Sequence, residues 1–72
     1  MKLLNPDDYT PINSERIKEI RDEMCNVPNN GWKQIKWDID TINNKELPLT
    51  LRTYMFNHLP YCVVNIILRG YK

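Results

Sequence analysis

The feature that most limits the fold of this chain is its length, because a short chain can bury only one small core. With 72 residues it forms one domain at most, near the size at which a single hydrophobic core is only marginally sufficient. The free energy gained by burial is nearly offset by an ordering entropy of about 1.5 kcal/mol per residue. We therefore expect one globular domain over residues 1–72, for which a well-packed sheet, a second copy or a partner matters more than in a larger protein.

The composition excludes several classes of protein. Hydrophobic residues make up 42% of the chain and charged residues 26%, as in globular domains rather than disordered ones. The longest apolar stretch, residues 61–68, is far shorter than the roughly 20 residues that cross a membrane. The first eight residues hold two leucines followed by a proline and two acids, which does not fit the core of a signal peptide. We therefore expect a cytoplasmic protein without a membrane partner.

The first 28 residues are predicted to hold a lead-in segment and one helix. Residues 1–10 form the lead-in, with turn chemistry at residues 5–8, where a proline lies between Asn and Asp side chains. The helix is predicted over residues 13–26, capped by Asn13 or Ser14 and ended by the proline that follows Val27. Four apolar residues at spacings of three and four give it one core-facing stripe: Ile17, Ile20, Met24 and Val27.

A strand is predicted over residues 32–42, because apolar and polar residues alternate there. A period of two is typical of a strand with one buried face and one solvated face. The alternating residues are Ile35, Trp37 and Ile39 on one side and Lys36, Asp38 and Asp40 on the other.

Residues 47–58 fit two patterns. Leu47, Leu49 and Leu51 continue an alternation typical of a strand, whereas Leu51, Tyr54, Met55, His58 and Leu59 would form the stripe of a short helix. We favour the strand because Thr and aromatic residues suit a pleated surface. A three-residue loop at 43–45 would also pair Ile39 with Leu49 and Trp37 with Leu51, so that core meets core. Pro48 counts against this choice, because proline is rare at the start of a central strand.

A last strand over residues 61–69 completes the predicted fold. It is an α+β domain in which one helix packs on a three-stranded antiparallel meander, in the order α-β-β-β. If residues 47–58 are helical, the order becomes α-β-α-β. The predicted core consists of Ile17, Ile20, Met24, Ile35, Trp37, Ile39, Leu49, Leu51, Val64, Ile66 and Leu68.

The inventory of reactive side chains predicts neither catalysis nor a cofactor. His58 is the single histidine, and no third group is placed to orient a pair of His58 and Cys62 for nucleophilic attack. A structural zinc site needs four Cys or His ligands in clustered spacing, and this chain has three candidates in all. Two glycines are too few for a phosphate-binding loop. Cys25 and Cys62 are expected to be free thiols, and the sequence does not decide whether they lie near each other.

Two surfaces are predicted to bind a partner. The face of the sheet that the helix leaves uncovered would carry large apolar and aromatic residues, as interfaces do; its candidate residues are Arg52, Tyr54, Phe56, Tyr61, Val63 and Ile67. The helix would present an acidic face that could meet a basic groove, formed by Glu15, Glu19, Asp22 and Glu23.

The function expected from these features is protein binding. The chain would be a small inhibitor or adaptor that occludes a partner's surface. Its nine asparagines and eight isoleucines suggest AT-rich coding and a phage or viral source, which would place it in the host cytoplasm. The alternative is a single-stranded nucleic-acid binder that stacks bases on the aromatic sheet face. The last strand, an unprotected sheet edge, could also pair with its copy in a homodimer.

Overall fold

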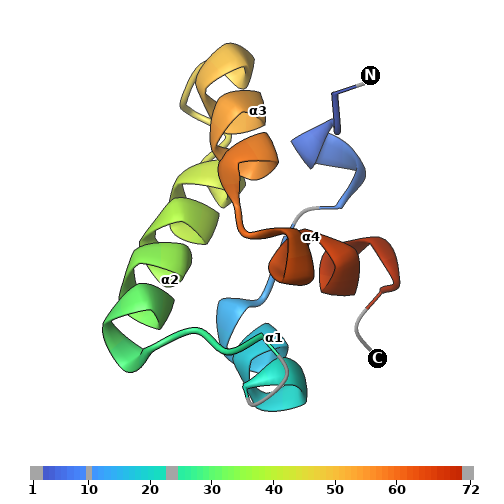
Figure 1. Ribbon diagram of the computed structural model, residues 1–72. Coiled ribbons are helices and arrows are strands. Elements are labelled where there is room, and N and C mark those ends of the chain that lie inside the picture. The colour runs from blue at the N-terminus through green and yellow to red at the C-terminus, as the bar shows by residue number, and fades with distance from the viewer. Residues whose placement is uncertain (1–2, 10, 23–24, 71–72) are drawn as a thin grey trace.

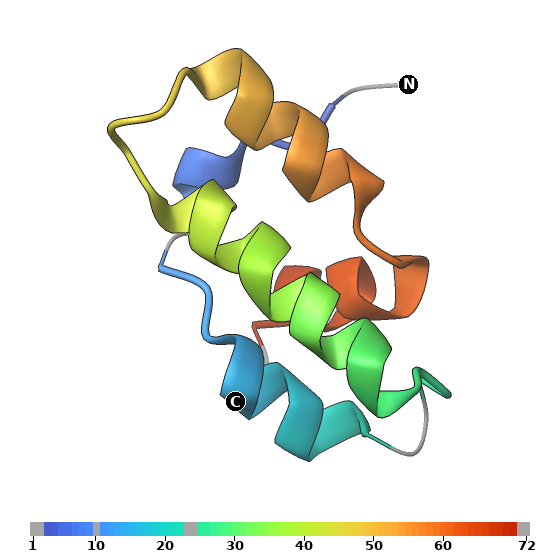
Figure 2. The ribbon, with the colours of Figure 1, turned by 90° about the vertical axis from the view of Figure 1, so that its left-hand side faces the viewer.

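The computed structural model describes residues 3–9, 11–22 and 25–70, and within these ranges every regular element is a helix. A short 3-10 helix, η1 (Pro6–Asp8), precedes four α-helices: α1 (Ser14–Arg21), α2 (Asn29–Asn43), α3 (Leu49–His58) and α4 (Tyr61–Leu68). The longest helix, α2, lies beside α3, which runs back along it in the opposite direction (Figures 1 and 2). Helix α1 contacts both α2 and α4, and η1 lies against α3.

The predicted α+β meander is therefore wrong, and so is its α-β-α-β alternative, because the described residues contain no strand. Residues 32–42 show why. Ile35 and Ile39 are four residues apart, a spacing that fits both a strand and a helix. The structure extends the helical spacing to Trp32 and Ile42, which are also buried, while Trp37 is 67% exposed. Trp37 alone created the apparent period of two.

Residues 49–58 and 61–68 are helical as well. In α4 the buried residues recur at i, i+1, i+3 and i+4, which places them on one face of a helix; they are Val63, Val64, Ile66 and Ile67. The predicted sheet edge at residues 61–69, through which a homodimer was expected to form, is this buried helix.

Three of the helices begin directly after a proline, which explains where the chain turns. Pro28, Pro48 and Pro60 are the N-cap residues of α2, α3 and α4, each with an extended ψ of 141–158°. Their carbonyl oxygens accept the first helical hydrogen bonds, at 3.1–3.2 Å from the amide nitrogens of Trp32, Arg52 and Val64. Proline suits this position because its fixed φ and missing N–H cost nothing before the first turn. Pro48 thus marks a helix start, not a strand.

The N-terminal part of the prediction agrees better with the structure. The turn expected at residues 5–8 is η1, whose first turn is capped by the Asn5 side chain. Helix α1 starts after Asn13, whose Oδ1 accepts a hydrogen bond from the Arg16 amide at 3.1 Å. The lead-in is also part of the core: Pro6 is fully buried, and Tyr9 packs edge-to-face on Phe56 with ring centroids 5.6 Å apart.

The core lies between α2, α3 and α4, with α1 and the lead-in closing it. Of the residues predicted for it, Ile17, Ile35, Ile39, Val64 and Ile66 are buried. Ile20 is half-buried and Met24 lies outside the described residues. The remaining four are exposed instead: Trp37, Leu49, Leu51 and Leu68.

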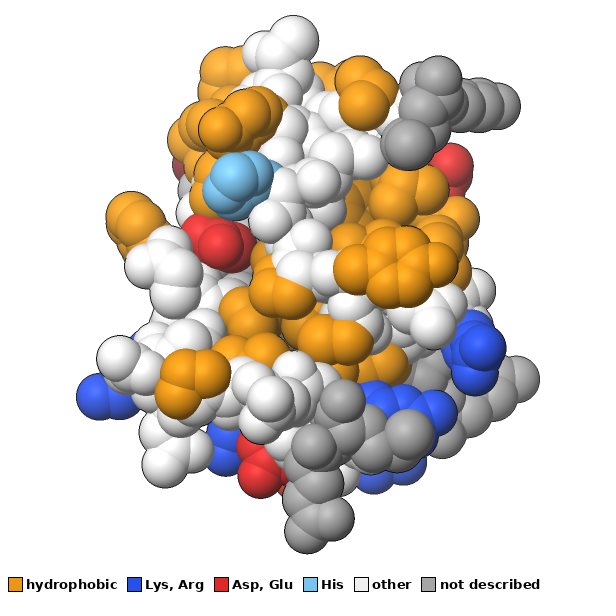
Figure 3. Space-filling view, viewed as in Figure 1, with side chains coloured by type: hydrophobic (Ala, Val, Ile, Leu, Met, Phe, Trp, Pro, Cys, Tyr) orange, Lys and Arg blue, Asp and Glu red, His pale blue; other side chains and the backbone are white. Residues whose placement is uncertain are grey.

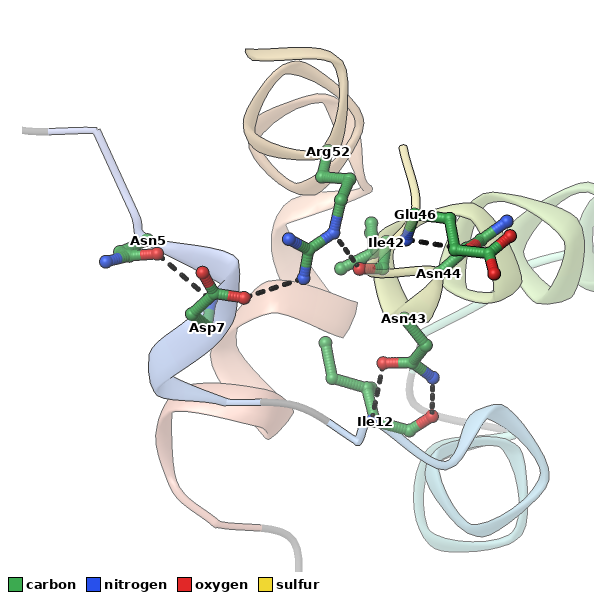
Figure 4. A network of polar contacts seen from close by, with 8 residues as sticks. All are labelled: Asn5, Asp7, Ile12, Ile42, Asn43, Asn44, Glu46 and Arg52. Carbon is green, nitrogen blue, oxygen red and sulfur yellow. Dashed lines mark hydrogen bonds and ion pairs between the residues drawn. The ribbon is translucent and has the colours of Figure 1, made fainter. Parts of the chain in front are cut away.

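One buried cation connects three segments of this core (Figure 4). The Arg52 side chain of α3 is 3% exposed. Its Nε donates to the carbonyl oxygen of Ile42 at 2.7 Å, and its Nη2 donates to Oδ1 of Asp7 in η1 at 2.7 Å. The carbonyl of Ile42 belongs to the last turn of α2, where helical carbonyls lack internal partners and positive charge is favoured. Arg52 therefore caps α2 and holds η1 against α3.

Two asparagine side chains fix the segment that leads into α1. The amide of Asn43 makes both hydrogen bonds that Ile12 offers, accepting from its N–H at 3.0 Å and donating to its carbonyl at 2.8 Å (Figure 4). Asn57 binds the backbone of Leu4 in the same two-bond manner, at 3.2 and 3.3 Å. In a sheet, a neighbouring strand pairs the backbone N–H and C=O groups of an extended segment. Here the asparagine side chains pair them instead.

We expect Arg52→Met to destabilise the fold while leaving it helical. The substitution keeps the volume of the side chain but leaves the Ile42 carbonyl without its buried partner, which costs about 2 kcal/mol of unfolding free energy. Asp7 is 45% exposed and can be solvated when the cation is gone. Urea unfolding followed by circular dichroism measures the loss.

Asp7→Asn is the matched control for this prediction. It keeps an oxygen acceptor for Arg52 and removes only the charge, so we expect it to lose less, about 1 kcal/mol, with the loss shrinking as salt screens the pair. Wild-type stability in Arg52→Met would contradict the importance assigned to this group.

Candidate functional site

Helix α3 carries apolar side chains on both its inner and its outer side. Arg52, its one Lys, Arg, Asp or Glu residue, points into the molecule together with Phe56, whereas Leu49, Leu51 and Tyr54 are 49%, 42% and 62% exposed. Leu51, Tyr54 and His58 follow one another at spacings of three and four, which places them in line on one side of the helix. Figure 3 shows hydrophobic side chains gathered over α3, with the histidine beside them. We call Leu3, Leu49, Leu51, Tyr54 and His58 the α3 surface.

A groove of about 480 Å³ runs along this surface. One wall is Leu3 from the lead-in, and the remaining lining comes from α3, namely Leu49, Thr50, Thr53, Tyr54, Asn57 and His58. The rings of Tyr54 and His58 stack with centroids 5.5 Å apart and an interplanar angle of 12°. This stack gives the groove a flat aromatic wall, while the two threonines leave room on the floor.

The groove carries no strong charge. None of the described residues that line it is a Lys, Arg, Asp or Glu, and the Arg52 guanidinium of the same helix is turned inward. Phosphate groups are bound mainly by Arg, Lys and free backbone amides, so this lining does not suit them. It suits an apolar or aromatic anchor, for which no charge must be desolvated.

A second groove, of about 370 Å³, lies between α1 and α2 and has mixed charge. Lys18, Lys33 and Lys36 line it together with Glu15. Lys36 pairs with Asp40 at 3.3 Å and Lys18 with Asp22 at 3.8 Å. Trp32 also lines the groove, but its Nε1 is buried and has no hydrogen-bond partner among the described residues. This nitrogen is therefore shielded from a ligand in the groove.

The two cysteines, whose separation the sequence left open, lie together. Cys62 is in the first turn of α4 and donates a hydrogen bond from Sγ to the carbonyl oxygen of Cys25, 3.9 Å away. Both thiols are free and half-buried. Burial raises the pKa of Cys25 to about 12, aided by its hydrogen bond to the Cys62 thiol and by the charge that thiol can carry, and opposed by nearby Arg21. Cys25 is therefore a protonated thiol at neutral pH.

The structure separates the residues predicted for the aromatic interface. Tyr54 and Tyr61 are exposed, by 62% and 83%, but lie on different helices. The other four candidates are buried: Arg52, Phe56, Val63 and Ile67. Sequence analysis missed Leu49 and Leu51, which it assigned to the core, and Leu3. The sequence held one signal for this arrangement, because Arg52 is the one Lys, Arg, Asp or Glu residue of α3. The side of the helix that carries it differs from the exposed side.

The predicted acidic helix face is only partly acidic. Glu15, Glu19 and Asp22 are exposed on or beside α1, and Glu23 lies outside the described residues. Glu19 pairs with Arg16 at 3.6 Å and Asp22 with Lys18. Alternating charges along α1 leave no single-sign field to steer a partner.

Three further findings concern metal ligands, membrane helices and similarity to known proteins. The described residues include no group of three or more His, Cys, Asp or Glu side chains that could hold a metal ion. No helix in the described ranges has the length and apolar character needed to cross a bilayer. Comparison of the chain with protein-family models, curated proteins and solved structures finds no match.

The raised pKa of Cys25 predicts slow alkylation of the folded protein. At pH 8 we expect iodoacetamide to modify Cys25 at least about 100-fold more slowly in the native state than in urea, because only the thiolate reacts. The rate should rise roughly tenfold per pH unit up to pH 11, since the pKa is about 12. Because the unfolded thiol loses its proton first, unfolding free energy should fall as pH rises above about 9. Quenched alkylation with peptide mass spectrometry measures the rates.

Cys62→Ser provides the control for this measurement. It removes the ionisable thiol at position 62, whose coulombic contribution raises the pKa of Cys25, so alkylation of Cys25 should become faster. A native rate that levels off below pH 9 would contradict the raised pKa.

Proposed function

We propose that this protein acts by binding another protein through the α3 surface, as a small inhibitor or adaptor that occludes part of its partner. The observation that supports this proposal is the set of large apolar side chains that α3 exposes on its outer side. Burying a Leu or an aromatic side chain is worth about 1.5–3 kcal/mol, yet this helix exposes two leucines and a tyrosine. Such a patch is typical of an interaction site.

The chemistry of the groove supports a partner with an apolar binding segment. Its uncharged lining, with the stacked rings of Tyr54 and His58 on one side, fits an apolar helix of the partner with one large side chain as an anchor. Amphipathic helices bind hydrophobic grooves in this way, through residues spaced by three and four. Tyr54 is the residue expected to contribute most, because aromatic side chains dominate the energetics of interfaces.

Single-stranded nucleic acid is the alternative partner. The salt dependence of the binding affinity distinguishes it from a protein partner. The exposed Trp37 and the neighbouring Lys33 lie on α2, away from the uncharged groove lining. Nucleic-acid affinity falls steeply with salt because bound cations are released, whereas an apolar interface loses little. We further propose that the protein has no catalytic activity and works in the cytoplasm, where thiols such as Cys25 and Cys62 stay reduced.

The partner can be identified by site-specific photo-crosslinking in the native host. A photoreactive phenylalanine analogue replaces Tyr54 in one variant and Trp37, an equally exposed aromatic residue of α2, in the other. We expect a discrete adduct from position 54 that is absent from position 37 and persists after nuclease treatment. Mass spectrometry of the adduct identifies the partner and the segment that is attached.

Substitutions then test the surface with the purified partner. We expect Tyr54→Asp and Leu49→Asp each to weaken binding at least about 30-fold, as hot-spot losses of 2 kcal/mol or more imply. Both side chains are exposed, so the fold should keep its circular dichroism spectrum and unfolding midpoint. Trp37→Asp is the control and should bind like the wild type. Calorimetry at two salt concentrations measures all four proteins.

Three results would refute the proposal. Unchanged affinity in Tyr54→Asp and Leu49→Asp would place the interface elsewhere. A steep loss of affinity with salt, or of the adduct with nuclease, would favour a nucleic acid. If the protein self-associates with rising concentration and Leu49→Asp abolishes this, a second copy of the chain occupies the groove on α3. That result would exclude an adaptor.

A further inference from the structure

Cys25 and Cys62 lie close together in the fold although they are far apart in the sequence. Cys25 follows α1, and Cys62 is the second residue of α4, 37 positions later in the chain. Cys62 Sγ donates to the carbonyl oxygen of Cys25 at 3.9 Å, and the Cys62 side chain is close enough to the Cys25 thiol to raise its pKa. The two side chains therefore lie close together, and neither lines the groove on α3.

Both backbones that carry these thiols are held in place. The amide of Cys25 donates to the carbonyl of Arg21, the last residue of α1, at 2.9 Å. Asn26 then takes a left-handed conformation, with φ of 49°, and reverses the chain; asparagine tolerates this region better than most residues. On the other side, Pro60 caps the turn that contains Cys62. The approach of the thiols is thus a product of two fixed helix ends.

We propose that Cys25 and Cys62 are a redox-active pair that closes an intramolecular disulfide when the protein meets hydrogen peroxide or an oxidised low-molecular-weight thiol. With peroxide, one sulfur is oxidised to a sulfenic acid and a water molecule is released. The second thiol then attacks that sulfur, the S–S bond forms, and a second water leaves with the hydroxyl oxygen. The two thiols lose two electrons and two protons in total, and the peroxide is reduced to two waters. With glutathione disulfide, one thiolate attacks and forms a mixed disulfide, which releases one glutathione; the second thiol then displaces the other glutathione as the intramolecular S–S bond forms.

The bond would join the end of α1 to the start of α4. Closing this loop reduces the freedom of the unfolded chain, so the native state gains stability. Because Cys25 holds its proton at neutral pH and only thiolates react quickly, closure is slow without a strong oxidant and proceeds faster at higher pH. A cytoplasmic pool of reduced thiols would keep the pair open, and oxidation would lock the two helix ends together.

The experiment oxidises the folded wild-type protein with glutathione disulfide and, separately, with hydrogen peroxide. We expect the mass to fall by two hydrogen atoms, both thiols to become unreactive toward maleimide, and a tryptic peptide pair to contain Cys25 joined to Cys62. The unfolding midpoint should rise by roughly 10 °C or more, and dithiothreitol should reverse every change. The equilibrium constant for closure should be about 100-fold larger in buffer than in urea.

Single variants provide the controls. Cys25→Ser and Cys62→Ser should show no change of midpoint under the same oxidants, because neither can close the bond. Asn26→Gly keeps the left-handed turn and should close like the wild type, whereas Asn26→Val strains that turn and should close less favourably. Mixed disulfides with glutathione at both cysteines, or closure no more favourable in buffer than in urea, would overturn the proposal.

Discussion

Near the centre of the molecule the guanidinium of Arg52 joins three segments that are distant in sequence. It occupies the carboxyl end of α2, reaches the carboxylate of Asp7 in η1, and belongs itself to α3. A buried cation is tolerated only when its donors are matched by acceptors, so these three segments must meet in one relative arrangement. In a chain this short, where apolar burial alone leaves little surplus, such a polar junction decides how the helices are oriented.

The same junction determines which side of α3 the partner would meet. Because Arg52 and Phe56 face inward, the rotation of the helix about its axis is fixed, and Leu51, Tyr54 and His58 must face outward. The lead-in, held by Asn57 through Leu4, supplies Leu3 as the second wall of the groove. The core and the proposed binding surface are therefore two sides of one helix, and the packing of the inner side sets the orientation of the outer side.

The comparison with sequence-based expectation shows where pattern analysis succeeds. The start of α1 was predictable from Asn13, and Ile17, Ile35 and Ile39 from their apolar character. The strand assignment failed because Ile35 and Ile39 fit both periods and Trp37 tipped the choice, although its ring is solvated. The three prolines that precede α2, α3 and α4 carried the better signal. Of the candidate interface, only Tyr54 lies in the groove, because the strand assignment put alternate residues on one face, whereas the helix turns Arg52 and Phe56 inward. The contact between Cys25 and Cys62 has no local signal in the sequence.

The asparagine amides that hold the lead-in also make it sensitive to chemical ageing. An amide serves both the N–H and the carbonyl of one residue because it carries a donor and an acceptor side by side. Slow deamidation turns asparagine into an acid, which at neutral pH can only accept. At Asn43 the lost donor faces the carbonyl of Ile12, 2.8 Å away, so attraction would become repulsion between two oxygens; at Asn57 the same exchange would face Leu4. Deamidation at either position would thus loosen the N-terminal segment.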